Sequence, residues 1–358
     1  MANSTTAAKA KNNNIQMLRG ICALMVFLSH SLNFFPIPGV ETIKHTPLHL
    51  LYDGQCAVML FFVMGGYFYY RQTETTVGIY AKGVWKKMVR IYPPHLICLA
   101  VGIVAITLFQ NADTTYAYSQ LTDWANIFWH DELTVSDVAK NALLLSPGVT
   151  DLINPPIWYL VIEVRMLVLL PLLLWLCQRT NYVWLYLLMI PAAIMHVPFL
   201  NYLFPYLMGM VLHRHQDSIH LIHKWMYIPI LLLGIFLLDL YNIFPLDTIP
   251  EWLDSICIAL QSVGAAMIIY CIKDMGQARS SKAGSRTTDT GTAGTSSTTF
   301  LGLLLVKMGN ISYEFYLAHF ILLLTFSLLL PIAYLTIPLT FAASILAAYI
   351  YNKVVKRE

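Results

Sequence analysis

Apolar runs of nearly membrane-spanning length recur along the whole chain. An α-helix of about 20 apolar residues crosses the roughly 30 Å hydrocarbon core of a bilayer. Only 11% of the residues are charged, against about 25% in a soluble domain. We therefore predict an all-α fold, a polytopic membrane helix bundle of about ten transmembrane helices. The predicted spans are 15–34, 53–70, 91–110, 157–177, 181–197, 199–213, 225–244, 254–272, 308–330 and 334–352.

Basic residues cluster in alternate loops. If the N-terminus lies in the cytoplasm, the inside loops carry the clusters between Arg71 and Arg90 and between Lys273 and Arg286. The outside loops then hold only Lys44 and Lys140. Because inside loops are enriched in Lys and Arg, both termini are predicted to be cytoplasmic. The expected macromolecular surroundings are a lipid bilayer, with no nucleic-acid partner.

Three polar segments flank or interrupt the membrane domain predicted at 15–352. Residues 1–14 are expected to form a disordered cytoplasmic N-terminus, 275–299 a flexible cytoplasmic loop rich in Ser, Thr, Gly and Ala, and 353–358 a cytoplasmic tail. Outer loop 111–156 contains Trp124 and Trp129 and is expected to lie on the outer membrane interface. The six cysteines show no paired spacing of a disulfide framework or metal site, and no metal is expected.

Arg19 and His30 are polar residues within the first apolar run. Eleven helical steps turn through about 1100°, so both side chains lie within roughly 20° of one face and about 16 Å apart along the axis. An intramembrane histidine is costly unless it faces protein or a cavity. Imidazole accepts protons near neutral pH, which suits a general base. A core histidine bonded to a neighbouring helix is the structural alternative.

Glu163 lies about 9 Å below the start of the span at 157–177. His30 lies about four residues below the outer end of its own span, so the two side chains are predicted to share a depth and form a His–Glu dyad. The alternative is a structural hydrogen bond between helices. Arg165 is two residues on and points away from the face of Glu163. It is expected to pair with another helix or to line the cavity.

Lys87 and Arg90 stand at the cytoplasmic mouth of the third predicted span. At a spacing of i, i+3 they share a helix face. Arg grips phosphate with two bonds and Lys acts as a point charge, so the pair suits a phosphate site. The positive-inside rule also explains both residues without a ligand.

His319 lies part-way up the ninth predicted span, above Tyr313 and Glu314. A second set of polar groups at membrane depth indicates either a cavity lining or polar packing between helices.

Five motifs occur in the same order as in acyltransferase family 3, and the chain therefore resembles that family. Its members are integral membrane proteins that move acyl groups onto sugars and other hydroxyl acceptors. The resemblance covers residues 15 to 352. The matching motifs are Arg-x10-His at Arg19 and His30, the aromatic stretch 57–70, the basic pair Lys87 and Arg90 followed by Ile-Tyr-Pro at 91–93, Trp-Tyr-Leu-x-x-Glu at 158–163, and Gly-x-x-Ser-Tyr-x-x-Tyr-Leu-x-His at 309–319.

Four positions depart from the family pattern. Met59 replaces the usual Asp of the second helix, Gly65 replaces the Ser of a Ser-Gly pair, Lys87 replaces an Arg, and Arg165 stands where an uncharged polar residue is more usual. Lys87 keeps the charge but loses the two-bond grip on phosphate.

The resemblance implies an O-acetyltransferase that uses acetyl-CoA as donor. The CoA phosphates would lie near Arg19, Lys87 and Arg90. His30, oriented by Glu163, would activate an acceptor hydroxyl or carry the acetyl group itself. His319, Tyr313, Trp158 and Arg165 would line the acceptor cavity.

The resemblance also implies a glycan or lipid-linked sugar acceptor, such as a cell-surface polysaccharide or lipopolysaccharide, and a multi-pass location in the bacterial inner membrane. A proton-coupled transporter of a small solute or sugar is the alternative, because buried His, Glu and Arg also mark such carriers. The chain shows no matching halves, which such carriers often have.

Overall fold

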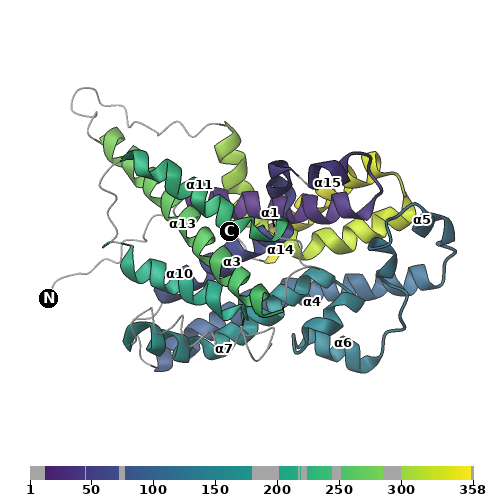
Figure 1. Cartoon of the computed structure of the whole chain (residues 1–358). Coiled ribbons are helices and arrows are strands. Elements are labelled where there is room, and N and C mark those ends of the chain that lie inside the picture. The colour runs from purple at the N-terminus through teal and green to yellow at the C-terminus, as the bar shows by residue number, and fades with distance from the viewer. Residues whose placement is uncertain are drawn as a thin grey trace, which may run out of the picture.

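The computed structural model describes residues 13–44, 46–71, 77–179, 201–216, 218, 224–243, 251–284 and 300–355. These residues form helices and loops and contain no strand. The longer helices are α1 (Asn13–Phe34), α3 (Gly54–Arg71), α4 (Val77–Gln110), α7 (Trp158–Arg179), α10 (Leu203–His215), α11 (Tyr227–Leu238), α13 (Glu251–Gly284), α14 (Phe300–Leu329) and α15 (Ala333–Val355), arranged as one bundle (Figure 1).

Shorter helical segments lie in the connections between these helices. They are α2 (Val40–Lys44), η1 (Pro47–Tyr52), α5 (Thr115–Ser119), η2 (Ala125–Ile127), α6 (Val135–Ala142), η3 (Pro147–Leu152), η4 (Pro155–Ile157), η5 (Lys224–Met226) and α12 (Leu240–Ile243).

Within the described residues, five helices are long and apolar enough to cross a membrane. They cover Asn13–Phe34, Ala81–Gln110, Leu253–Lys273, Phe300–Leu329 and Ala333–Val355, and Gly54–Tyr69 and Tyr227–Leu238 are shorter apolar helices. The prediction of an all-α chain with membrane-length helices is confirmed for these residues. The count of ten spans and the side of the membrane on which the termini lie stay predictions.

Several predicted boundaries differ from the helix ends. α4 begins at Val77, well before the predicted start at residue 91, so Lys87 and Arg90 belong to the helix itself. α13 continues to Gly284, which makes the first part of the predicted flexible loop helical. The sequence there contains the good helix formers Gln, Ala, Arg and Lys. The predicted span 181–197 and segments 1–12, 285–299 and 356–358 lie outside the described residues.

The first and the penultimate helices, α1 and α14, lie side by side (Figure 1). Their backbones approach closely at Gly309, where a Cβ atom would collide with the backbone carbonyl oxygen of Gln16. Membrane helices lack a strong hydrophobic drive between them and gain stability from close packing at small residues. Gly309, with Gly20 on α1, therefore permits the close separation of α1 and α14.

Replacing Gly309 with alanine is expected to lower the melting temperature of the detergent-solubilised protein. The added methyl group forces the two backbones apart, and overpacking of this kind costs about 1–3 kcal/mol. Gly83→Ala is the matched control, because no atom lies within 4 Å of a Cβ at that position. The control should melt at the wild-type temperature or above it, since alanine favours the helix. Equal melting temperatures for the two variants would contradict this account of α1–α14 packing.

α1 and α14 run in the same direction, since Gln16 lies by Gly309 and Phe34 lies 5.3 Å, between ring centroids, from Phe320. α15 returns antiparallel to α14, with Ala348 packed in the same cluster as Met308. This arrangement brings the described start of α1 and the described end of α15 to one end of the bundle.

The connection between α4 and α7 runs back alongside α4, and the prediction that it lies on the outer membrane interface stays a prediction. Backbone carbonyls of this connection make hydrogen bonds with side chains of α4. His95 Nε2 lies 3.0 Å from the Asn141 carbonyl oxygen, and the Tyr92 hydroxyl donates to the Leu143 carbonyl at 3.2 Å. Backbone polar groups away from water need such partners. The polar residues within α4 thus allow this connection to run alongside the helix.

The start of α7 is fixed to the middle of α14. Asn154 Nδ2 donates to the Leu317 carbonyl at 2.9 Å, and the Tyr316 hydroxyl donates to the Pro156 carbonyl at 2.6 Å. α7 therefore begins about half-way along α14, which determines the depth of Glu163.

Candidate active site

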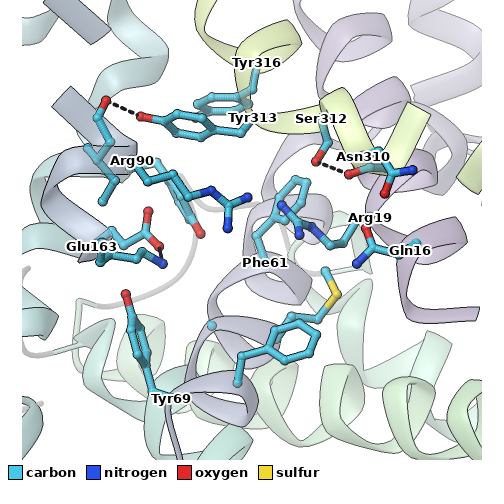
Figure 2. A pocket seen from close by; sticks show the side chains of 17 residues that line it. Gln16, Arg19, Phe61, Tyr69, Arg90, Glu163, Asn310, Ser312, Tyr313 and Tyr316 are labelled. Carbon is cyan, nitrogen blue, oxygen red and sulfur yellow. Dashed lines mark hydrogen bonds and ion pairs between the residues drawn. The ribbon is translucent and has the colours of Figure 1, made fainter. Parts of the chain in front are cut away.

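A cavity of about 350 Å³ is lined by residues of α1, α3, α4, α7 and α14 (Figure 2). Its charged lining consists of Arg19, Lys87, Arg90 and Glu163. Three cationic groups and one carboxylate give these four side chains a formal charge of +2. Aromatic side chains form much of the remaining wall, namely Phe61, Phe68, Tyr69, Tyr159, Tyr313 and Tyr316.

Lys87 and Glu163 form an ion pair inside this cavity. The Lys87 Nζ atom lies 2.6 Å from Glu163 Oε1, and the Glu163 side chain is only 8% exposed. Lys87 also lies over the ring of Tyr69, with Nζ 4.6 Å from the ring centroid. The lysine is therefore held by one carboxylate and one aromatic face. Lys87 adds a positive charge to the lining of the cavity, while its ammonium group is ion-paired with Glu163.

The two arginines of the cavity face one another. Figure 2 shows the guanidinium groups of Arg19 and Arg90 directed into the same space from opposite walls. Arg19 is repelled by Arg90 and attracted by Glu163 and Glu314. No ion pair or hydrogen bond joins either guanidinium to another described residue. Ten N–H donors in all, five on each guanidinium, are thus available for an anionic ligand.

α14 sets the distance between these arginines. Close packing at Gly309 places α1, and with it Arg19, on one side of the cavity. On the other side, the Tyr313 hydroxyl donates to the Ile91 carbonyl at 2.9 Å, next to Arg90 on α4. The motif residues of α14 therefore fix α1 and α4 on either side of the cavity.

His30 lies beyond this cavity, further along α1. Its ring is partly exposed and stacks on Trp124, with 5.8 Å between centroids and 8° between planes. The ring of Phe320 meets it edge-on at 5.1 Å, and the ring of His319 lies at 5.3 Å. His30 thus has an aromatic environment, and its nearest described ionisable neighbour is a second histidine.

The predicted pairing of His30 with Glu163 is not what the structure shows. Glu163 lies beside Lys87 and Arg19, and His30 lies beside His319. The prediction placed the start of α7 at the outer membrane edge, whereas the bonds from Asn154 and Tyr316 place it half-way along α14. Glu163 therefore lies deeper than expected, in the same cavity as Arg19 and away from His30.

The remaining predicted site residues lie in different environments. Tyr313 lines the cavity. His319 lies outside its lining, next to His30, and is fully buried. Trp158 packs against Tyr202, with 5.3 Å between centroids. Arg165 donates to the Leu145 carbonyl at 2.8 Å, so it bonds the α4–α7 connection and does not line this cavity.

Sequence reasoning missed Trp124 and Tyr69. Trp124 stacks on His30, and Tyr69 stands under Lys87. The only signals in the sequence are the aromatic residues of 111–156 and of 57–70, and neither specifies which polar partner it contacts.

A second polar cluster joins the start of α3 to the end of α11. Potential ligand atoms of His49, Asp53 and Asp239 lie within 4.8 Å of one another. Asp53 Oδ1 accepts from the Cys56 N–H at 2.9 Å and so caps α3. Asn242 Nδ2 donates to Asp53 Oδ2 at 2.8 Å and also to Asp239. These hydrogen bonds hold two helix ends together, and we assign the cluster a structural role.

The ion pair of Lys87 and Glu163 can be tested with a double-mutant cycle. Lys87→Met and Glu163→Gln are each expected to lower the free energy of unfolding, because each leaves a poorly hydrated charge without its partner. The double variant removes both charges, so it should be less destabilised than the sum of the two. A coupling energy of about 1–3 kcal/mol is expected from denaturant unfolding in detergent. Additive effects would show that the two charges do not stabilise one another.

Comparison with known proteins assigns the chain to a family. A family model described as an acyltransferase domain, that of acyltransferase family 3, matches residues 12–352. No curated protein and no solved structure matches the chain. The family match spans nearly all of the sequence, including every residue of the cavity and both histidines. The chain therefore belongs to acyltransferase family 3, as a helical membrane protein with an acyltransferase domain.

Proposed function

We propose that this acyltransferase moves an acetyl group from acetyl-CoA to a hydroxyl of a cell-surface polysaccharide or lipopolysaccharide sugar, in a bacterial inner membrane. The observation that carries the proposal is the pair of guanidinium groups, Arg19 and Arg90, directed into one cavity. Membership in an acyltransferase family supplies the reaction class.

The cavity suits the phosphates of a CoA thioester. Its formal charge of +2 attracts an anion, and two guanidinium groups can each bind a phosphate with paired N–H···O bonds. Lys87 adds positive charge, while Glu163 holds its ammonium group at 2.6 Å. A volume of about 350 Å³ lies within the usual range of about 300–1,000 Å³ for ligand sites.

His30 is the proposed general base. It stands eleven residues after Arg19 on α1, about 16 Å along the helix axis, a distance that the pantetheine arm can span. One ring nitrogen takes the proton of the acceptor hydroxyl as its oxygen forms a bond to the thioester carbonyl carbon. The carbon–sulfur bond then breaks, and the CoA thiolate takes the proton from the imidazolium.

A route through an acetyl-imidazole uses the same residue. There a ring nitrogen of His30 forms a bond to the thioester carbonyl carbon, and the carbon–sulfur bond breaks to release CoA. The acceptor oxygen then bonds to the acetyl carbon as the bond to His30 breaks, and the freed imidazole takes the hydroxyl proton. Radiolabelled acetyl-CoA without acceptor distinguishes the two routes, because only the second leaves labelled protein.

The proposed acceptor site lies on the side of His30 that faces Trp124. Trp124 is 38% exposed and comes from the α4–α7 connection, which the positive-inside rule places outside. A sugar presents apolar C–H faces that pack on aromatic rings, so an exposed tryptophan beside the base suits a glycan. The identity of the acceptor as a surface glycan rests on the resemblance described above.

The proposal is tested by donor turnover. Detergent-purified protein is given acetyl-CoA, and the free thiol is measured with and without cell-envelope glycan. Glycan-stimulated thiol release, with label recovered in the glycan, is expected. Absence of CoA binding and of thiol release with every envelope fraction would overturn it. The same preparation in proteoliposomes tests sugar uptake, the activity of the transporter alternative, for which the family match gives no support.

A further inference from the structure

His319 has one ring nitrogen that no protein group satisfies. The side chain is fully buried, and Nε2 is an enclosed atom without a hydrogen-bond partner among the described residues. A buried polar atom without a partner is costly, so its retention calls for an explanation. Polar packing between helices, the structural reading of this histidine, does not account for Nε2.

The other ring nitrogen determines what Nε2 can do. His319 Nδ1 lies 2.6 Å from the Tyr316 carbonyl oxygen. A carbonyl oxygen only accepts hydrogen bonds, so Nδ1 carries the hydrogen of the neutral ring. Nε2 is then the unprotonated nitrogen, and its lone pair needs a donor.

His30 is a neighbouring residue that can supply this donor. The two imidazole rings are 5.3 Å apart between centroids and tilted by 30°. Two imidazoles joined by an N–H···N bond of about 2.9 Å have centroids about 5 Å apart, since each ring nitrogen lies about 1.1 Å from its own centroid. The separation therefore already matches a bonded pair, and the broad energy well of the histidine χ2 torsion allows His30 to turn an N–H toward Nε2.

We propose that His319 is a positioning residue, which accepts a hydrogen bond from His30 and so fixes the catalytic tautomer. The inference rests on the proposed function of His30. With one N–H of His30 bonded to His319, the opposite nitrogen carries the lone pair and faces the acceptor. The histidine pair takes the place of the His–Glu dyad expected from the sequence.

The histidine pair also stabilises the positive charge that forms on His30 during acetyl transfer. When His30 takes the hydroxyl proton it becomes an imidazolium, and its second N–H strengthens the bond to the neutral His319 ring. No proton is lost from the pair, because the imidazolium returns one proton to the CoA thiolate. Phe320 packs against both rings and Phe27 packs against that of His319, which limits their hydration. A neutral acceptor stabilises the imidazolium there without adding a buried anion.

The experiment compares His319→Leu with His319→Gln. The glutamine side chain can place an amide oxygen near the position of Nε2, and leucine supplies no acceptor. We expect kcat for acetyl transfer to fall at least 10-fold in His319→Leu, with the KM for acetyl-CoA within 2-fold of wild type, and to recover in part in His319→Gln. Ser327→Ala is the matched control. It removes another fully buried polar side chain of α14, one that is bonded to the Leu324 carbonyl, and should leave kcat unchanged.

A second readout does not depend on acyl transfer. The rate at which diethylpyrocarbonate modifies His30, followed by mass spectrometry of the peptide, reports the nucleophilicity of its free nitrogen. That rate should fall several-fold in His319→Leu and recover in part in His319→Gln. Wild-type modification of His30 in His319→Leu would overturn the inference, even in a preparation that lacks acetyltransferase activity. Equal losses of kcat in both variants, together with lowered melting temperatures, would assign His319 a purely structural role and also overturn it.

Discussion

Replacing His30 with alanine is expected to lower the rate of acetyl transfer by about 10²- to 10⁴-fold, the usual contribution of a general base. The affinity for acetyl-CoA should stay near that of wild type, because His30 is not among the residues that line the cavity of Arg19 and Arg90. The measurements are thiol release under saturating donor and calorimetric binding of CoA to the detergent-solubilised protein.

The control for His30→Ala is His130→Ala. His130 is an exposed histidine of the α4–α7 connection, with its ring 4.5 Å, between centroids, from that of Tyr118. Its removal should leave transfer unchanged. A His30→Ala enzyme with wild-type turnover would rule out both the general-base route and the acetyl-imidazole route, because both use the same ring.

Loss of both Arg19 and Arg90 is expected to weaken the binding of acetyl-CoA by at least 100-fold. A hydrogen bond to a charged group contributes about 1.5–3 kcal/mol, so each arginine is expected to account for a factor of about 10 to 150. The double variant Arg19→Gln/Arg90→Gln keeps the polarity of the cavity while removing two charges. Binding of CoA in detergent is the direct measurement, and its salt dependence should be shallower in the variant.

Two controls distinguish a loss of phosphate recognition from a general loss of folded structure. Lys86→Gln removes an exposed basic residue that precedes Lys87 but does not line the cavity, so CoA should bind it as it binds the wild type. Acetyl-pantetheine lacks the nucleotide phosphates, so the double variant and the wild type should use it equally. If the double variant bound CoA with wild-type affinity, these arginines would be ordinary positive-inside residues.

Local spacing predicted the parts of the site that lie on one helix. The interval between Arg19 and His30 places both on one face of α1, and Lys87 with Arg90 follows from a spacing of i, i+3. The structure brings Arg19, Lys87, Arg90, Glu163 and Tyr313 to one cavity. Their grouping agrees with the expectation that charged residues at membrane depth share a protein interior.

Contacts between helices were harder to predict, because they depend on the axial offset of one helix against another. The partner of Glu163 depends on the position of the start of α7 along α14, and that is set by two hydrogen bonds from Asn154 and Tyr316. The partner of His30 depends on the offset of α1 against α14, which Gly309 sets by permitting backbone contact. The axial offset between two helices cannot be predicted from the hydropathy of their sequences.

The contact between α1 and α14 constrains how the protein is made. A ribosome completes α1 almost 300 residues before it completes α14, so these contacts have a very high sequence separation and form late. During that interval the polar groups of α1 lack the protein surroundings that make them tolerable in lipid. The nascent chain therefore needs the insertion machinery or the intervening helices to shelter α1. Neither the cavity of Arg19 and Arg90 nor the contact between His30 and His319 exists until synthesis is nearly over, so a product truncated before α14 lacks both parts of the proposed site.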